Sequence, residues 1–331
     1  MPKGILERLA EGPVLGDGGY LLELEKRGYV QAGPFTPEVA IEHPDALEQL
    51  HREFLRAGAE FLTTMTFYAS DDKLETVGMK DKVDEINRNA VVVARKVAAE
   101  GDALVAGDVS LMWAYDPADP ASADHVRALF DRQLQDMTDA GGVDLWVGET
   151  FSYLGEALLF VERAKATGVP VMVTMSFEQP VARSYEGDTP ADCARKLSDA
   201  GADIVGVNCL NGPEQQLPIA LEMRSAVGGF VAAQPVAYRT SAEHPDFTST
   251  PSFPYGLDPL QLSRQEMGEY ARAAKEGGID YIGSCCGSIQ AHVRAMGKAI
   301  GKTPEAEREW KSSAGRAMSA YEYHEHTETE V

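Results

Sequence analysis

The stretch GADIVGVNCLNGPEQQLPIALEMRSA, residues 201–226, reads as one buried strand followed by one amphipathic helix. Its first part, Ile204–Cys209, is an almost continuous apolar run, which is typical of a strand that is covered on both faces. Its second part, Glu214–Ala226, mixes apolar and polar residues at helical spacing. A strand followed by a helix is the repeating unit of a parallel α/β sheet.

The same unit recurs along the whole chain of 331 residues. Eight such units predict a single closed (β/α)₈ barrel, or TIM barrel, with an open doubly wound sheet as the alternative. GDGGY, at residues 16–20, lacks the spacing of a dinucleotide-binding glycine motif. The candidate strands are Val14–Gly16, Phe61–Thr66, Ala103–Val109, Leu145–Glu149, Val171–Ser176, Ile204–Cys209, Phe230–Pro235 and Tyr281–Cys285. The candidate helices include Pro44–Ala57, Asp84–Glu100, Ala123–Ala140, Gly155–Thr167, Pro190–Ala200, Glu214–Ala226 and Arg264–Glu276.

Two segments depart from this pattern. The segment Tyr238–Leu257 is rich in Pro, Ser and Thr and predicts a long loop, and long loops in compact domains are often functional. We expect the barrel to occupy residues 1–303, followed at 304–331 by a short helical stretch and a polar tail. The last residues, Glu322–Val331, lack periodicity, so we expect them to be poorly ordered.

The composition excludes some classes of partner. The formal net charge of −22 argues against nucleic acid and against an anionic membrane surface, because both require clustered Lys and Arg. The N-terminal residues MPKGILERLAEG have no signal-peptide pattern, and no apolar run is long enough to span a bilayer. Four cysteines do not make a disulfide framework in a chain of this length. We therefore expect a cytoplasmic protein with reduced thiols.

Chemically distinctive residues follow the predicted strands. In a barrel, the loops at the carboxyl ends of the strands form the active site. The residues at such positions are Asp17, Phe67, Tyr68, Glu149, Cys209, Cys285 and Cys286.

Three of these residues are thiols, and three thiolates with an open fourth position suit a catalytic zinc ion. Adjacent strand residues point to opposite faces, so Cys285 and Cys286 can share one ion only if their strand breaks. The glycines at 283 and 287 permit such a break. Two alternatives stay open from the residues alone, because buried cysteines often pack as small apolar groups and a vicinal disulfide is conceivable. Cys193, inside a helical pattern, is expected to be such a packing residue.

The motifs GDGG, GVNC and GSCCG, taken in this order, resemble the homocysteine S-methyltransferase family. The segments HREFLRAGAEFLTTMTFYASDDKLE and FPYGLDP are similar to its betaine-type branch, and the resemblance extends over roughly residues 4–300. It implies a (β/α)₈ barrel with one catalytic zinc ion held by Cys209, Cys285 and Cys286 at the carboxyl ends of the strands. The homocysteine sulfur would be the fourth ligand.

The resemblance also implies a reaction. A methyl group would pass from an onium donor, with glycine betaine as the first candidate, to homocysteine, giving methionine and dimethylglycine. Asp17 and Glu149 would hold homocysteine, chiefly through its ammonium group, and Gly18 and Gly19 would let the backbone approach it. Phe35, Phe67 and Tyr68 would line the donor pocket, and Tyr68 could occupy the vacant zinc position. The alternative from another class is a barrel that contains zinc and binds onium compounds without turnover.

Two departures from the betaine-type pattern leave the donor open. Phe35 stands where those enzymes carry tryptophan, and Thr150 stands where they carry tyrosine. Tyr153 or the segment 113–115 could compensate for the lost aromatic surface. Dimethylsulfoniopropionate, proline betaine and S-methylmethionine therefore remain candidate donors. Longer family members add a C-terminal arm for assembly, so a homo-oligomer also remains open for this chain.

Overall fold

The computed structural model describes residues 3–30, 37–177 and 181–302. Phe35 and the segment 304–331, which carry predictions made above, lie outside the described residues. The expectations for the donor pocket at position 35, and for the helical stretch and polar tail, therefore stay predictions.

The described chain forms a parallel eight-stranded barrel in the order β1-β8-β7-β6-β5-β4-β3-β2. Neighbouring strands in this order pair in parallel, and β1 meets β2 through Glu60, whose N–H donates to the carbonyl of Leu15 at 3.0 Å. The predicted barrel is thus confirmed, and an open doubly wound sheet is wrong. The strands are β1 (Val14–Leu15), β2 (Phe61–Thr63), β3 (Leu104–Ser110), β4 (Leu145–Phe151), β5 (Val171–Met175), β6 (Ile204–Asn208), β7 (Phe230–Gln234) and β8 (Tyr281–Ile282).

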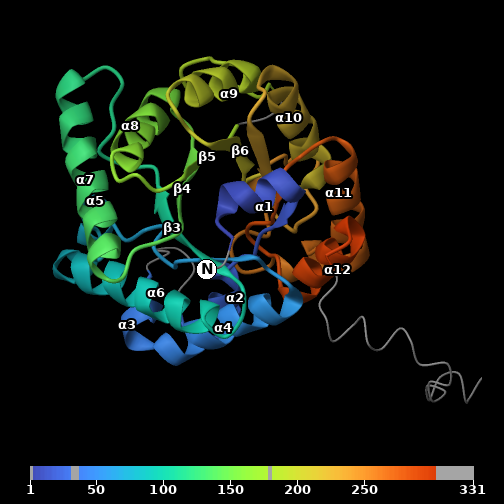
Figure 1. The fold of residues 1–331 in the computed structure, drawn as a ribbon, viewed down its shortest axis with the longest axis horizontal. Helices are drawn as coiled ribbons and strands as arrows, with labels where there is room; N and C mark the ends of the chain where they lie inside the picture. The colour runs from blue at the N-terminus through green and yellow to red at the C-terminus, as the bar shows by residue number, and fades with distance from the viewer. Residues whose placement is uncertain (1–2, 31–36, 178–180, 303–331) are drawn as a thin grey trace, which may run out of the picture.

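Helices surround the strands (Figure 1). Two predicted helices have the expected bounds, because Pro44 occupies the first turn of one and Ser263 caps the other through a capping box with Glu266. The helix α12, which follows β8, was missing from the prediction. The α-helices are α1 (Ile5–Glu11), α2 (Leu21–Lys26), α3 (Val39–Glu42), α4 (Pro44–Ala57), α5 (Asp71–Glu75), α6 (Val83–Ala98), α7 (Pro120–Asp139), α8 (Leu154–Lys165), α9 (Pro190–Asp199), α10 (Pro213–Ala226), α11 (Arg264–Glu276) and α12 (Gln290–Ile300).

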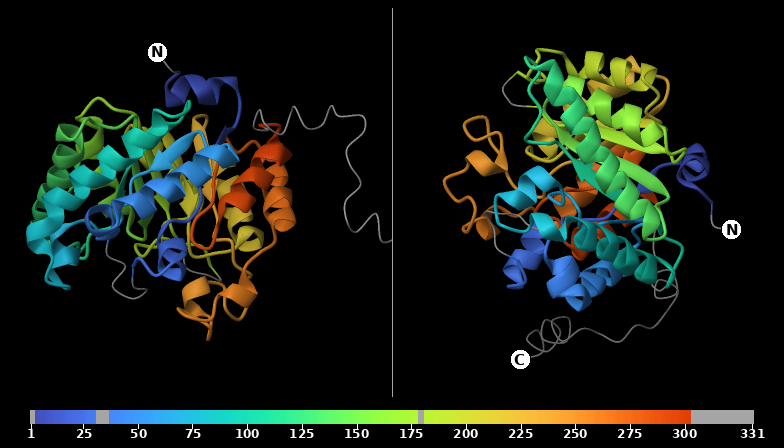
Figure 2. Two further views of the ribbon diagram at one scale, coloured as in Figure 1. Left: turned by 90° about the horizontal axis from the view of Figure 1, so that it is seen from below. Right: turned by 90° about the vertical axis from the view of Figure 1, so that its left-hand side faces the viewer.

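The barrel interior is filled by side chains at its amino-terminal end. Ile5 and Leu9 of α1 pack there against Leu104, Leu145 and Tyr281 on the inner faces of the strands. Helix α1 lies over this end in Figure 1. In Figure 2 it lies at the opposite end of the barrel from the loop around residue 250, coloured orange. The amino-terminal end is therefore closed, and the carboxyl ends of the strands are left for chemistry.

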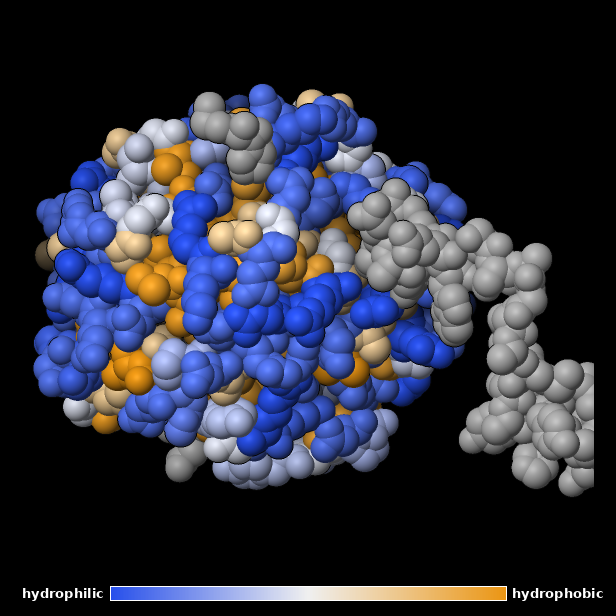
Figure 3. Space-filling model, turned by 60° about the horizontal axis from the view of Figure 1, so that its bottom comes forward, coloured by the Kyte–Doolittle hydropathy of each residue, from blue (hydrophilic) through white to orange (hydrophobic). Residues whose placement is uncertain are grey.

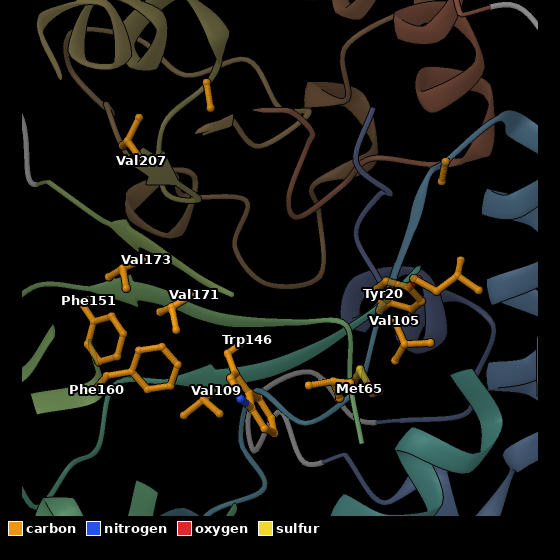
Figure 4. Close-up of a cluster of buried hydrophobic side chains, with 14 of the residues drawn as sticks. Tyr20, Met65, Val105, Val109, Trp146, Phe151, Phe160, Val171, Val173 and Val207 are labelled. Atoms are coloured by element: carbon orange, nitrogen blue, oxygen red, sulfur yellow. The ribbon is translucent and has the colours of Figure 1, made fainter. Parts of the chain in front are cut away.

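The larger core lies between the strands and the helices. Figure 4 shows Trp146 and Phe151 of β4 with Phe160 of α8 in this layer, and the rings of Phe151 and Phe160 are 5.8 Å apart. The indole N–H of Trp146 donates to Thr167 Oγ1 at 2.8 Å, so this large side chain is buried without an unpaired donor. Tight packing of this layer holds the strand ends in fixed positions.

The surface face in Figure 3 is mainly hydrophilic, with small scattered hydrophobic areas. Among the residues that the structure describes, no helix has the length and apolar character needed to cross a membrane.

Candidate active site

A cavity of about 210 Å³ opens at the carboxyl ends of the strands. Nine predicted site residues line it, namely Asp17, Gly18, Gly19, Phe67, Tyr68, Glu149, Cys209, Cys285 and Cys286. A wider groove of about 790 Å³ between α11 and α12 lies on the outer wall, and none of these nine residues lines it. The structure thus brings together side chains that are up to 269 positions apart, from Asp17 to Cys286.

Three thiols converge at one side of the cavity. The Sγ atom of Cys286 lies 3.9 Å from that of Cys209 and 4.0 Å from that of Cys285, and all three sulfurs lie within 4.8 Å of one another. A tetrahedral ion with zinc–sulfur bonds of about 2.3 Å requires sulfurs about 3.8 Å apart, so the donor set fits zinc. A vicinal disulfide, with sulfurs about 2 Å apart, does not describe this pair. All three cysteines are free thiols.

The backbone turns sharply to bring these sulfurs together. Strand β8 ends at Ile282, before the cysteine pair, so the alternation of a strand does not apply to Cys285 and Cys286. Pro235 and Ala237 hold the pair in place, because the N–H of Cys285 donates to the Pro235 carbonyl at 2.8 Å and the N–H of Ala237 donates to the Cys286 carbonyl at 2.9 Å. After β6, Cys209 has a φ of 57°, which is uncommon for a residue other than glycine.

Gly19 explains how the first loop approaches the thiols. A Cβ atom at this position would lie 2.7 Å from the carbonyl oxygen of Cys285 and 3.1 Å from Cα of Cys286. Gly18 is equally constrained, because its Cβ would lie 2.5 Å from the ring of Phe54. Both glycines line the cavity, but their immediate contacts are with protein, so close packing of loops already requires them.

The neighbouring thiols shift the pKa values of both Cys209 and Tyr68. Hydrogen bonding with the thiols of Cys285 and Cys286 holds the pKa of Cys209 well below its usual value. Burial, together with the charges of Cys209 and Cys286, raises the pKa of Tyr68 to about 12. Tyr68 therefore keeps its phenolic proton at neutral pH and can act as a hydrogen-bond donor beside the sulfurs.

Glu149 is turned into the cavity by an irregularity in β4. The register between β4 and β5 shifts between Gly148 and Phe151, and Thr150 has a φ of 63°. Asn208, next to Cys209, fixes this turn by donating from Nδ2 to Glu149 Oε2 at 2.9 Å and to Thr150 Oγ1 at 2.8 Å. Burial first, and then the charge of Asp108, raises the pKa of Glu149 well above its usual range.

The carboxylate of Asp17 accepts hydrogen bonds from other residues of the protein. Its Oδ2 accepts from the hydroxyl of Tyr20 and from the N–H of Thr63, both at 2.7 Å, and its Oδ1 accepts from Thr63 Oγ1 at 3.1 Å. The Tyr20 proton points to Asp17, so His51 Nδ1, 3.0 Å from the same hydroxyl, must carry the hydrogen and donate. Burial raises the pKa of Asp17 to about 6 and lowers that of His51 to about 3.

The low pKa of His51 predicts a loss of stability in acid. Below the usual histidine pKa of about 6.5, the unfolded chain takes up a proton at His51 that the folded protein refuses until about pH 3. The free energy of unfolding should therefore fall as the pH decreases through this window. Between pH 7 and pH 5, this loss should be about 2 kcal/mol larger in the wild type than in His51→Gln. Urea unfolding of both metal-free proteins measures it, and equal losses would contradict the assignment.

Aromatic side chains form another wall of the cavity. The rings of Phe67 and Tyr68 are 4.8 Å apart with their planes near perpendicular, and both line the cavity. The ammonium of Lys73 lies 5.0 Å from the Tyr68 ring and donates to Ser110 Oγ at 2.5 Å, so it supports this wall. Phe247, from the predicted long loop, also lines the cavity and stacks on Tyr238 with ring centroids 5.6 Å apart.

Several lining residues were not predicted from the sequence. Asp108 lies within β3, where its charge interrupts an apolar run, but nothing in that run indicates whether its side chain faces the cavity. Phe247 could have been found only as an aromatic residue inside a loop already suspected of function. Conversely, Tyr153 and the segment 113–115 do not appear in the described lining, although the rings of Trp113 and Tyr68 are 5.9 Å apart. Phe247, rather than Tyr153, supplies a further aromatic ring.

The sequence matches the family model for homocysteine S-methyltransferases over residues 14–300. It is 46% identical to betaine–homocysteine S-methyltransferase 1 of Danio rerio over 317 residues, which cover 92% of this chain and 78% of that protein. It is 41% identical to S-methylmethionine–homocysteine S-methyltransferase BHMT2 of Pongo abelii, with 90% of this chain and 81% of that protein covered.

Among solved structures, the fold is similar to the metallated form of the homocysteine methyltransferase MmuM from Escherichia coli. The TM-score is 0.70 at 21% sequence identity, and the match covers 87% of this chain and 96% of that one. At this identity the likeness supports the barrel fold alone.

Proposed function

The chain belongs to the homocysteine S-methyltransferase family, and we propose that it transfers a methyl group from an onium donor to the sulfur of homocysteine. The observation that carries this proposal is the group of three thiols, with sulfurs 3.9–4.0 Å apart along two of its edges, beside a cavity lined by carboxylates and aromatic rings. The sulfur of homocysteine would form the new bond to the methyl carbon. The bond between that carbon and the onium atom would break, and its electron pair would stay on the donor.

We infer that Cys209, Cys285 and Cys286 hold one zinc ion. Zinc ionises a coordinating thiol and so supplies a homocysteine thiolate at neutral pH. With the metal bound, three cysteinates would make the surroundings electron-rich, and the carboxyl groups of Glu149 and Asp108 face the same cavity. A metal hydrolase is disfavoured, because three thiolates leave the ion a poor Lewis acid for water.

The donor is proposed to be a cation held against Phe67, Tyr68 and Phe247. Aromatic faces attract quaternary ammonium and sulfonium groups by about 0.5–2 kcal/mol each. Glycine betaine is the first candidate, in line with the relatives of 43–46% identity that are named for betaine. The relative named for S-methylmethionine, at 41% identity, keeps a sulfonium donor as the second candidate.

We also propose that residues 1–303 form the catalytic unit and that the protein works in the cytoplasm. The family model ends at residue 300, which supports this domain boundary. Free thiols that must stay reduced to bind zinc fit a reducing compartment.

The deciding experiment combines metal content with turnover. The purified protein should contain one zinc ion per chain and form methionine from homocysteine and one of glycine betaine, dimethylsulfoniopropionate, proline betaine or S-methylmethionine. Zinc without turnover with any of the four donors would favour a non-catalytic onium-binding barrel. Turnover without homocysteine, or methionine formation that survives removal of the metal, would contradict the proposal.

Replacing Tyr68 by alanine should lower kcat/KM for the preferred donor by about tenfold, because one aromatic face and a hydroxyl beside the sulfurs are lost. Phe247→Ala should act in the same direction and should mainly raise the KM of the donor. Tyr153→Phe is the matched control, since Tyr153 is absent from the described lining. Unchanged turnover of Tyr68→Ala with all four donors would refute an aromatic site for the cation.

A further inference from the structure

Lys73, in the short helix α5, is a buried ammonium group that the reaction proposed above does not use. It is only 2% exposed, and none of the ion pairs within the described ranges includes it. Burial lowers the pKa of Lys73 to about 8, against the opposing charge of Asp72, so the ammonium form still predominates at pH 7. A buried charge without a close counter-charge is costly, so the contacts of this ammonium have to compensate for that cost.

The ammonium joins the loop after β2 to the end of β3. Its Nζ atom donates to Ser110 Oγ at 2.5 Å and to the carbonyl of Phe67 at 3.3 Å. The hydroxyl of Ser110, the last residue of β3, donates to the same carbonyl. The carbonyl of Phe67 is therefore held by two donors, one of which is charged and fully buried.

The same ammonium also contacts the two rings that follow β2. Its Nζ atom lies 5.0 Å from the centre of the Tyr68 ring and 5.7 Å from the centre of the Phe67 ring. Both rings line the cavity, whereas Lys73 does not. Lys73 therefore supports the rings from outside the cavity, through their π-systems as well as through the backbone between them.

Asp72, the neighbour of Lys73 in the sequence, fixes the helix that carries the ammonium. Its Oδ2 accepts from the N–H of Trp113 at 2.6 Å and from the N–H of Ala114 at 3.3 Å, both in the loop after β3. These bonds hold the first turn of α5 against that loop. Lys73 is thereby placed beneath the aromatic wall by a contact that does not involve the wall itself.

We propose that Lys73 is a positioning residue for the methyl donor, and that its ammonium holds Phe67 and Tyr68 so that each ring keeps a face toward the cavity. This inference rests on the proposed function, because it concerns the donor side of the same site. Lys73 makes no hydrogen bond to a cysteine or to Glu149 within the described chain, so its loss should not affect homocysteine directly.

The test replaces Lys73 by methionine, which has a similar length and no charge. Steady-state kinetics, with each substrate varied in turn, should show a KM for the preferred donor that is raised about tenfold, because the rings lose their fixed orientation. The KM for homocysteine should change by less than about twofold. Lys82→Met is the matched control, since it removes the same charge from an exposed ion pair with Glu85 and should change neither KM.

Ser110→Ala provides a second variant that keeps the ammonium and changes the volume very little. It should raise the donor KM in the same direction, and the effects of Ser110→Ala and Lys73→Met should not be additive, because both act on the Phe67 carbonyl. If Lys73→Met does not fold, the selective effect of Ser110→Ala decides the question. A Ser110→Ala protein with an unchanged donor KM would contradict the proposal.

The outcomes distinguish this inference from the proposed function. If the wild type forms no methionine with any of the four donors, the proposed function is wrong. If the wild type is active and Lys73→Met keeps its donor KM, or raises the KM of both substrates equally, Lys73 does not position the donor. A lower donor KM in Lys73→Met would show that the ammonium mainly repels the onium cation, which also contradicts the proposal.

Discussion

Replacing Cys285 by serine should remove the zinc ion and lower methionine formation by more than about a hundredfold. Residues that merely support a metal ligand typically contribute 10- to 100-fold, so the loss of a ligand should exceed that range. Cys209→Ser and Cys286→Ser should behave alike, because the three sulfurs lie within 4.8 Å of one another and act on the same ion. Zinc content by mass spectrometry and methionine formation by chromatography measure the two effects.

Cys193→Ala provides the matched control for this experiment. Cys193 is fully buried in α9, and burial raises its pKa to about 12, so it is a packing residue as its helical pattern predicted. Its replacement should leave the zinc content unchanged and affect only stability. A Cys285→Ser protein with full zinc and full turnover would refute the metal site, whatever the control shows.

Glu149→Gln should lower kcat/KM for homocysteine by roughly 30-fold to 5,000-fold, because removing one member of a buried charge pair costs about 2–5 kcal/mol. The loss should be in homocysteine use, with little change in the KM of the methyl donor. Steady-state kinetics with each substrate varied in turn distinguish the two. The new glutamine keeps the hydrogen bond from Asn208 only if its amide oxygen, rather than its NH₂ group, faces Asn208. A modest rearrangement of this side chain is therefore also expected.

Glu156→Gln is the companion variant. Glu156 is a buried glutamate of α8 that accepts from the N–H of Met112 and is absent from the described cavity lining. It should lose stability without a selective loss of homocysteine use. An effect of Glu149→Gln that was confined to the methyl donor would show that the carboxylate acts on the onium group instead.

Local sequence determined the units of this fold. The helix Pro44–Ala57 has its predicted bounds because proline at the first position and glycine after the last are signals carried by neighbouring residues. Likewise, eight apolar runs separated by helices were enough to indicate a closed barrel. The strands β2 and β8 are shorter than predicted, because β2 ends at Thr63 and β8 ends at Ile282, before the loops that carry Tyr68 and the cysteine pair.

The candidate site could be predicted from the sequence only in part, and the rest required the tertiary structure. Its nine predicted lining residues were identified from strand-end positions and from short motifs of the family. Such motifs can be recognised in the sequence because each consists of consecutive residues. Asp108 and Phe247 were not identified, because nothing in their own segments distinguishes a cavity-facing carboxylate or ring from a structural one. The hydrogen bonds that Asp17 accepts likewise depend on Thr63, 46 positions away. Periodicity is a property of consecutive residues and can therefore be read from the sequence. Whether a buried polar atom has a hydrogen-bond partner depends on which distant side chains reach it, and only the tertiary structure decides that.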